Sequence, residues 1–186
     1  MTSIVKPSAA LSLGPLAGLV LAAFVLTLAA CGGNDDGTSD SSVEEAAYFE
    51  ALAAALQPVN AQLDGLDELR AEAFDDGPNP AAAFAYGEAY ETFTSDRLAA
   101  IEAITPSENL AEKHQALVSA ASDGVLMARD LRAKLSEAPP ANDPEFLELF
   151  GSLEGAKITS RYLDACTKLQ SSATSGGLDV DLQCLR

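Results

Sequence analysis

The sequence predicts an all-α domain, a four-helix up-down bundle with a short C-terminal tail, from three observations. Apolar residues recur at intervals of three and four positions through most of the chain beyond residue 42, which is the spacing of one buried helix face. Prolines stand beside capping residues at several points, as they do in the first turn of a helix. The connections between the expected helices are short, which favours antiparallel neighbours.

The first helix is expected to begin at Ser41 or Ser42, because each serine has a glutamate three residues later, the signature of a capping box. Pro58 predicts a local kink, and the stretch 74–78 ends the helix. Its buried face comprises Phe49, Leu52, Leu56, Val59, Leu63 and Leu66. The opposite face is acidic and is expected to be solvated; it carries Asp64, Asp67, Glu68 and Glu72.

The second helix is expected to follow Asn79 as its cap, with Pro80 in the first turn. This is the aromatic-rich segment of the chain, and we expect its bulky residues to form core rather than a ligand platform. These residues are Phe84, Tyr86, Tyr90, Phe93, Leu98, Ile101 and Ile104.

The third helix is expected to begin at Thr105, since Pro106 and Glu108 follow it in the positions of a first turn, and to end before Pro139. One stripe along it comprises Leu110, His114, Leu117, Ala121, Val125, Ala128, Leu131 and Leu135. The only histidine of the chain is therefore predicted to point toward the apolar side.

Asp143 and Pro144 predict the start of the fourth helix. Gly151 and Gly155 allow the close approach of a neighbour. The stretch 171–177 is predicted to be a turn, and 178–184 alternates apolar with acidic or polar residues. That alternation favours an extended segment laid on the bundle, with a helical turn as the alternative. The buried side of the helix is expected to hold Phe146, Phe150, Leu153, Ile158, Tyr162, Cys166 and Leu169.

The amino-terminal stretch has the layout of a secretory signal. One cation, Lys6, precedes a run from 9 to 30 that contains no charged residue and ends in small residues. A run of this length could instead span a bilayer as an uncleaved helix. Gly14 and Pro15 interrupt it, however, and Gly32 follows where a membrane anchor normally carries Lys or Arg. We therefore expect a cleaved signal.

The run ends in an aliphatic residue, two small residues and a cysteine, namely Leu28, Ala29, Ala30 and Cys31. This stretch resembles the lipobox of bacterial lipoprotein precursors. The resemblance implies cleavage between Ala30 and Cys31, a diacylglyceryl group on the Cys31 thiol and an acyl chain such as palmitate on the new amino group. More than one chain is needed for stable attachment. The expected location is the extracytoplasmic face of the cell membrane, with the outer membrane or periplasmic side as possibilities in a double-membraned bacterium.

These features divide the chain into a signal peptide over 1–30, a lipidated tether over 31–42 and a helical domain over 43–186. The tether is small, polar and acidic, which is typical of a disordered linker. With Cys31 lipidated, Cys166 and Cys184 remain, and an even pair in an exported chain predicts a disulfide that pins the tail. Two free thiols or half a metal site is the alternative, although no histidine or further cysteine lies nearby.

The mature part has an inward histidine followed by a cysteine, a glycine turn and a V-D-L-x-C tail. In this combination it is similar to small exported helical lipoproteins of unknown function. The net charge of −17 argues against nucleic acid as a partner and repels anionic lipid head groups. The sequence contains no phosphate-binding glycine loop, no paired-histidine motif and no Cys-x-x-Cys. We therefore expect no enzyme, no cofactor and no metal.

The sequence thus predicts a lipid-anchored extracytoplasmic interaction or binding module, with the membrane and a protein of the cell envelope as partners. The alternative is a bundle that binds a metal or small ligand near His114, together with Tyr86 or Tyr90. A lone inward histidine is more often a core residue held by one hydrogen bond, and that interpretation of His114 is the simpler one.

Overall fold

A computed structural model describes residues 39–75 and 77–184, all within the unit Asp36–Arg186. The described residues form helices and loops without a strand, which confirms the all-α class. The elements are α1 (Ser39–Asn60), α2 (Leu63–Phe74), α3 (Pro80–Glu102), the 3-10 helix η1 (Glu108–Leu110), α4 (Ala111–Glu137), α5 (Asp143–Ser152) and α6 (Gly155–Ser175). The predicted signal peptide, the lipidation site Cys31 and the tether up to residue 38 lie outside the described residues.

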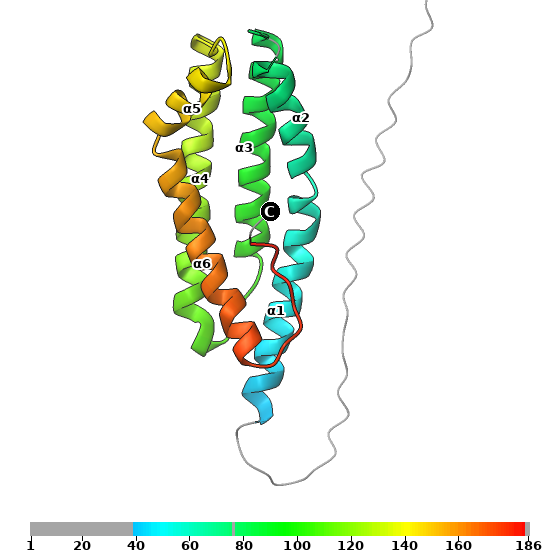
Figure 1. Cartoon of the computed structure of the whole chain (residues 1–186). Coiled ribbons are helices and arrows are strands. Elements are labelled where there is room, and N and C mark those ends of the chain that lie inside the picture. Colours follow the sequence, from blue (N-terminus) through cyan, green and yellow to red (C-terminus); the bar gives the residue numbers. More distant parts are fainter. Residues whose placement is uncertain (1–38, 76, 185–186) are drawn as a thin grey trace, which may run out of the picture. The chain divides into compact units, whose positions relative to one another are not determined.

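The helices lie side by side (Figure 1). α1 and α2 follow one another along one side, α3 lies between them and α4, and α5 and α6 follow one another beyond α4. The first and fourth predicted helices are thus each broken into two. None of the helices in the part of the chain that the structure describes is long and apolar enough to cross a membrane.

The first predicted helix differs from expectation at its start and in its middle. α1 already runs from Ser39, ahead of the expected start at Ser41 or Ser42. The kink expected at Pro58 is present as a full break one turn later. There the backbone N–H of Gln62 bonds to the carbonyl of Val59 at 3.0 Å, a tighter spacing than that of an α-helix. Pro58 itself has no N–H to donate, which weakens the turn that precedes the break.

Two helix starts follow the capping logic of the sequence. The side chain of Asn79 accepts a hydrogen bond from the backbone N–H of Ala82 at 3.2 Å, as predicted for the start of α3. At α5 the cap is Asn142, not Asp143: its side chain accepts from the N–H of Glu145 at 3.0 Å, and the Glu145 carboxylate accepts from the N–H of Ala141. Asp143 is left free to pair with Arg70 of α2.

The third predicted helix begins later than expected. Thr105 does not cap it; instead the backbone remains extended through Ser107, with ψ of 161°, and then makes the single turn η1 before α4 begins. That turn places Leu110 in the core, where it is 3% exposed.

The fourth predicted helix is interrupted at Glu154, whose φ of +56° is left-handed. Gly155 follows, and any Cβ there would overlap the ring of Phe150, whereas Gly151 faces open space. The expected close approach is therefore present at Gly155 only. α6 then continues to Ser175, so the turn predicted over 171–177 is confined to its end, at Gly176 and Gly177.

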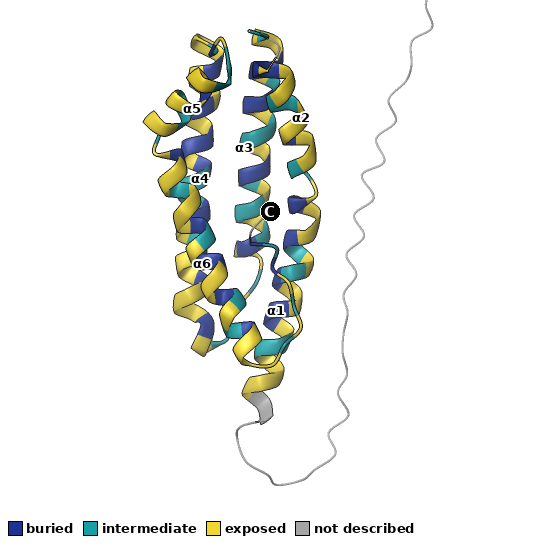
Figure 2. Ribbon diagram, in the orientation of Figure 1, coloured by how far each residue is buried: buried dark blue, intermediate teal, exposed yellow. Residues whose placement is uncertain are grey.

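Buried side chains line the inward faces of the helices (Figure 2) and form two clusters. The first cluster joins α1, the end of α3, η1, α4, α6 and the tail, and its fully buried members include Leu52, Leu117, Cys166 and Leu169. The second joins α2, α3, α4 and α5, and includes Phe74, Leu131, Leu135 and Phe146. Phe84 was expected in the core but is 42% exposed.

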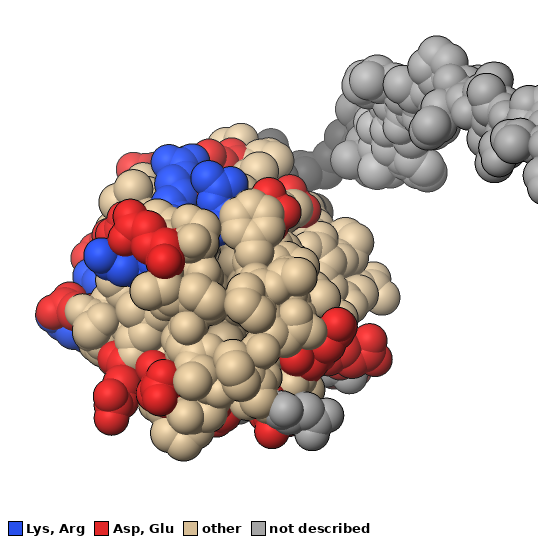
Figure 3. All heavy atoms as spheres, turned by 90° about the horizontal axis from the view of Figure 1, so that it is seen from above, with Lys and Arg blue, Asp and Glu red and all other residues tan. Residues whose placement is uncertain are grey.

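Charged side chains are unevenly placed on the end of the bundle where α2 meets α3 and α4 meets α5. Figure 3 views this end, and it shows acidic and basic groups around the edge of a mainly uncharged face.

The large apolar side chains that remain exposed belong to different helices; they are Val43, Phe84, Leu126 and Leu147. Single exposed apolar residues of this kind are common on the surfaces of folded domains.

Candidate functional site

A partly enclosed cavity of about 160 Å³ lies within the bundle. Its walls come from α2, α3, α4, α6 and the C-terminal tail, and they include residues of both core clusters. Most of these side chains are apolar or aromatic. The cavity therefore has the composition usual for small-molecule sites, apolar walls with a few polar groups.

Arg97 supplies the only charged side chain among the described residues that line this cavity. Its guanidinium carbon lies 4.0 Å from the ring centre of Phe93 and 4.6 Å from that of Tyr162. Its Nη2 donates a hydrogen bond to the side-chain oxygen of Asn60 at 3.2 Å. The two rings and the amide hold a cation inside the bundle, since a guanidinium is attracted to the faces of aromatic rings.

No carboxylate pairs with Arg97 in the described part of the chain. The other arginines of that part, Arg70, Arg129, Arg132 and Arg161, each pair with an aspartate or glutamate. The buried Nε of Arg97 has no hydrogen-bond partner among the described residues. Arg97 is thus a partly desolvated cation whose counter-charge the described protein does not provide.

Burial shifts the pKa values of the titratable groups of the cavity in opposite directions. Desolvation lowers the pKa of Arg97, and it raises the pKa values of Tyr90 and Tyr162. The nearby guanidinium opposes the rise for both tyrosines. At neutral pH the site therefore presents neutral phenols beside one cation, and its electrostatic character is that of an anion site.

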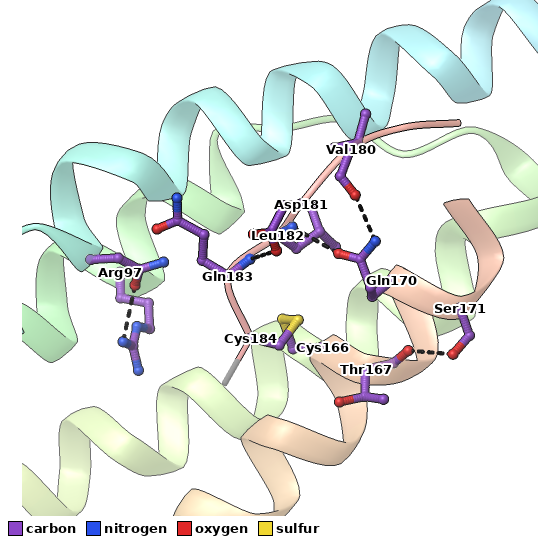
Figure 4. The surroundings of a disulfide bond; sticks show 11 residues. Arg97, Cys166, Thr167, Gln170, Ser171, Val180, Asp181, Leu182, Gln183 and Cys184 are labelled. Carbon is purple, nitrogen blue, oxygen red and sulfur yellow. Dashed lines mark hydrogen bonds between the residues drawn. A yellow bond between two sulfur atoms is a disulfide. The ribbon is translucent and has the colours of Figure 1, made fainter. Parts of the chain in front are cut away.

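The C-terminal tail forms one wall of the cavity through Gln183 and Cys184. The disulfide between Cys166 and Cys184 is present, as predicted, and ties the tail to α6. Gln170 of α6 holds the same tail by two hydrogen bonds (Figure 4), donating to the carbonyl of Val180 at 2.6 Å and accepting from the N–H of Leu182 at 2.8 Å. The tail forms no helix or strand from Leu178 to Gln183, whose backbone is left-handed. Its apolar residues Leu178, Val180 and Leu182 pack against the first core cluster, as the alternation predicted.

His114, which the sequence offered as the centre of a ligand site only in the alternative interpretation, lies outside this cavity. Its Nδ1 is 3.1 Å from the hydroxyl of Tyr48, which belongs to the first core cluster. The histidine itself is 7% exposed. Tyr86 belongs to the second cluster and stacks on Tyr90. The structure does not bring His114 together with Tyr86 and Tyr90, because they lie at different levels of the bundle; Tyr90 alone lines the Arg97 cavity.

The contact with Tyr48 gives His114 a structural role. Desolvation lowers the pKa of His114 and raises the pKa of Tyr48 to about 12. The histidine is therefore neutral at neutral pH, and its Nδ1 shares one hydrogen bond with the tyrosine hydroxyl. This is the core interpretation of a lone inward histidine, held by one hydrogen bond.

We expect acidification to destabilise the domain through His114. Because its pKa is lower in the folded state than the usual value near 6.5, the unfolded chain takes up the proton more readily, and stability falls as pH drops below about 6.5. The measurement is the Tm of the wild type and of His114→Gln between neutral and mildly acidic pH. The wild type should lose more Tm than the variant over this range; equal losses would contradict the assignment.

Among the described residues no group of three or more His, Cys, Asp or Glu is arranged to hold a metal ion. Comparisons with protein-family models, with curated proteins and with solved structures found no match to this chain.

Sequence reasoning missed Arg97, although a signal for it was present. Tyr86, Tyr90, Phe93 and Arg97 follow one another at steps of four, three and four, so the arginine continues the aromatic stripe of α3. It is also the only Lys or Arg of that helix. A lone cation on the apolar stripe of a helix is the pattern that would have pointed to this site.

Proposed function

We propose that this chain is a lipid-anchored extracytoplasmic binding module, in which a helical domain held at a membrane by lipid on Cys31 binds a small molecule in the Arg97 cavity. One observation supports binding above the others: within the described chain, Arg97 lines a cavity and no carboxylate neutralises it. Burial of a cation without a counter-charge costs free energy, and a bound anion offsets that cost.

In this proposal the domain is a four-helix up-down bundle. α1 with α2, and α5 with α6, are each treated as one broken helix, so that four helical segments alternate in direction. Bundles of this kind carry their ligand sites between facing helices, and the Arg97 cavity lies between α3, α4 and α6. The break between α1 and α2 then falls at the cavity, since Leu63 is the first residue of α2 and lines it.

The anchor rests on Leu28, Ala29, Ala30 and Cys31, the stretch that resembles a lipobox. Residues 32–38 separate Cys31 from the start of α1, and seven residues reach at most about 25 Å when fully extended. The proposed lipid would therefore keep the helical domain close to the membrane surface. Because the net charge of the chain is negative, anionic head groups repel the domain, and the lipid remains the main source of attachment.

We propose binding rather than catalysis. The described residues that line the cavity offer a guanidinium, phenols, hydroxyls and one amide, and they include no carboxylate or imidazole that could move a proton at neutral pH. The scattered exposed apolar residues give less support to a protein partner than the cavity gives to a small ligand.

Cys31→Ser is the variant that tests the anchor. The wild type should fractionate with membranes and enter the detergent phase on partition, whereas Cys31→Ser should accumulate as precursor or be released in soluble form, because a serine hydroxyl is not lipidated. The matched control is the double variant Cys166→Ser/Cys184→Ser, which removes the other two cysteines and their disulfide and should stay with the membranes. A Cys31→Ser protein that fractionates as the wild type, without precursor, would contradict the proposal.

A further inference from the structure

We propose that the Arg97 cavity binds a small carboxylate with one apolar ring, a ligand of the size of benzoate. This inference rests on the proposed binding function and names the ligand class of that same site. Three properties of the cavity support it: the unpaired guanidinium, the volume and apolar walls, and an open space beside a glycine of α4.

The guanidinium selects the charged end of the ligand. A guanidinium carries five N–H donors in a planar fork that matches a carboxylate, and the described protein uses one of them, in the hydrogen bond to Asn60. Phe93 and Tyr162 lie against the guanidinium and fix its plane. A carboxylate that enters the cavity therefore meets a cation already held in position, which reduces the cost of ordering on binding.

The volume and walls select the rest of the ligand. The cavity of about 160 Å³ is close to the roughly 150 Å³ of an engineered apolar cavity in another protein that holds a benzene molecule. Its walls include Tyr90, Met127 and Ile158, which offer contact to an apolar ring but little to a hydrated ion. In a chain of net charge −17, a small inorganic anion gains attraction from Arg97 alone, while a ring also gains apolar burial.

Gly124 marks the open part of the cavity. It lines the cavity from the middle of α4, and a Cβ built on it would meet no atom within 4 Å. Glycine lowers the stability of a helix interior, and no neighbouring side chain occupies the space that it leaves. A larger residue at this position would extend from α4 toward the ligand site, and its Cβ would meet no described atom.

The C-terminal tail forms a further wall of the cavity, beside those formed by the helices. Gln183 has a left-handed backbone, with φ of +53°, and its N–H donates to the side chain of Asp181 at 2.8 Å. Figure 4 shows Gln183 between the disulfide and Arg97. The disulfide at Cys184 therefore holds Gln183 at the edge of the cavity.

The test is a calorimetric titration of the purified full-length mature protein with three probes: benzoate, benzyl alcohol and acetate. Benzoate should bind more tightly than either of the others, because only benzoate has both the charge and the ring. Arg97→Gln should raise the Kd of benzoate by about tenfold or more and leave that of benzyl alcohol within about twofold. Arg129→Gln, the same change of charge at an arginine outside the cavity, should leave both values unchanged.

A second variant keeps the proposal testable should Arg97→Gln fail to fold. Gly124→Leu should abolish the binding of benzoate and of benzyl alcohol while the thermal unfolding transition is retained, since its side chain enters open space. Gly65→Leu is the control: it also lies inside a helix and faces open space, but it does not line the cavity. It should bind both probes as the wild type does.

Two results would overturn the proposal that the ligand is a carboxylate, although the cavity would remain a binding site. The first is that benzyl alcohol binds the wild type as tightly as benzoate does. The second is that Arg97→Gln leaves the Kd of benzoate unchanged. Binding of benzoate that survives Gly124→Leu would overturn the location. Failure of all three probes to bind the wild type would overturn this ligand class, and the anchor would still be judged separately by the fractionation of Cys31→Ser.

Discussion

Reduction of the Cys166–Cys184 disulfide is expected to lower the free energy of unfolding by about 3 kcal/mol, a fall in Tm of about 10 °C for a domain of this size. The bond closes a loop between residues 18 apart in the sequence, and opening that loop returns conformational entropy to the unfolded chain. The measurement compares the denaturation midpoints of the oxidised and reduced wild type, which differ by the bond alone.

The tail has other contacts that survive reduction. Leu182 is 1% exposed, and Gln170 holds the backbone on both sides of Asp181. The tail should therefore remain docked at low temperature and be released before the bundle unfolds. A reduced protein with the same midpoint as the oxidised one would show that these contacts alone fix the tail and would contradict the predicted loss.

Phe74→Ala is expected to destabilise the domain by about 3–5 kcal/mol. Phe74 is 1% exposed at the end of α2, stacks on Phe146 of α5 with ring centres 4.7 Å apart, and meets the edge of Tyr86 of α3. Removal of its ring leaves a space that three different helices would have to fill together. The measurement is chemical denaturation of the variant and the wild type.

Phe84→Ala is the matched control for Phe74→Ala. It is the same substitution on the neighbouring helix α3, but Phe84 is 42% exposed. Its loss should change the free energy of unfolding by no more than about 0.5 kcal/mol. Equal losses for the two variants would mean that the second core cluster does not contribute to stability as its burial indicates.

The sequence was a good guide wherever a regular pattern determines structure. The apolar stripe from Phe49 to Leu66 is buried apart from Leu63, which is half-buried, Asn79 caps α3, and His114 turns inward. The pairing of Cys166 with Cys184 also followed, because both lie where the tail returns along α6. In each case a local rule and the tertiary packing favour the same answer.

The sequence was a poor guide at breaks and at the site. The breaks at Gln62 and Glu154 depend on how each helix meets its neighbours, and Glu154 adopts a left-handed backbone that its side chain does not favour. The cavity depends on long-range contacts, since Asn60, Arg97, Tyr162 and Gln183 come from separate elements. Helical periodicity places each of them on a face but does not bring them together.

We propose that a lipid on Cys31 carries this helical domain at a membrane. The most direct measurement is the mass of the amino-terminal peptide of the protein purified from the membrane fraction. We expect a chain that begins at Cys31 and carries diacylglyceryl and acyl groups. A chain that still contains residues 1–30, with Cys31 unmodified, would contradict it.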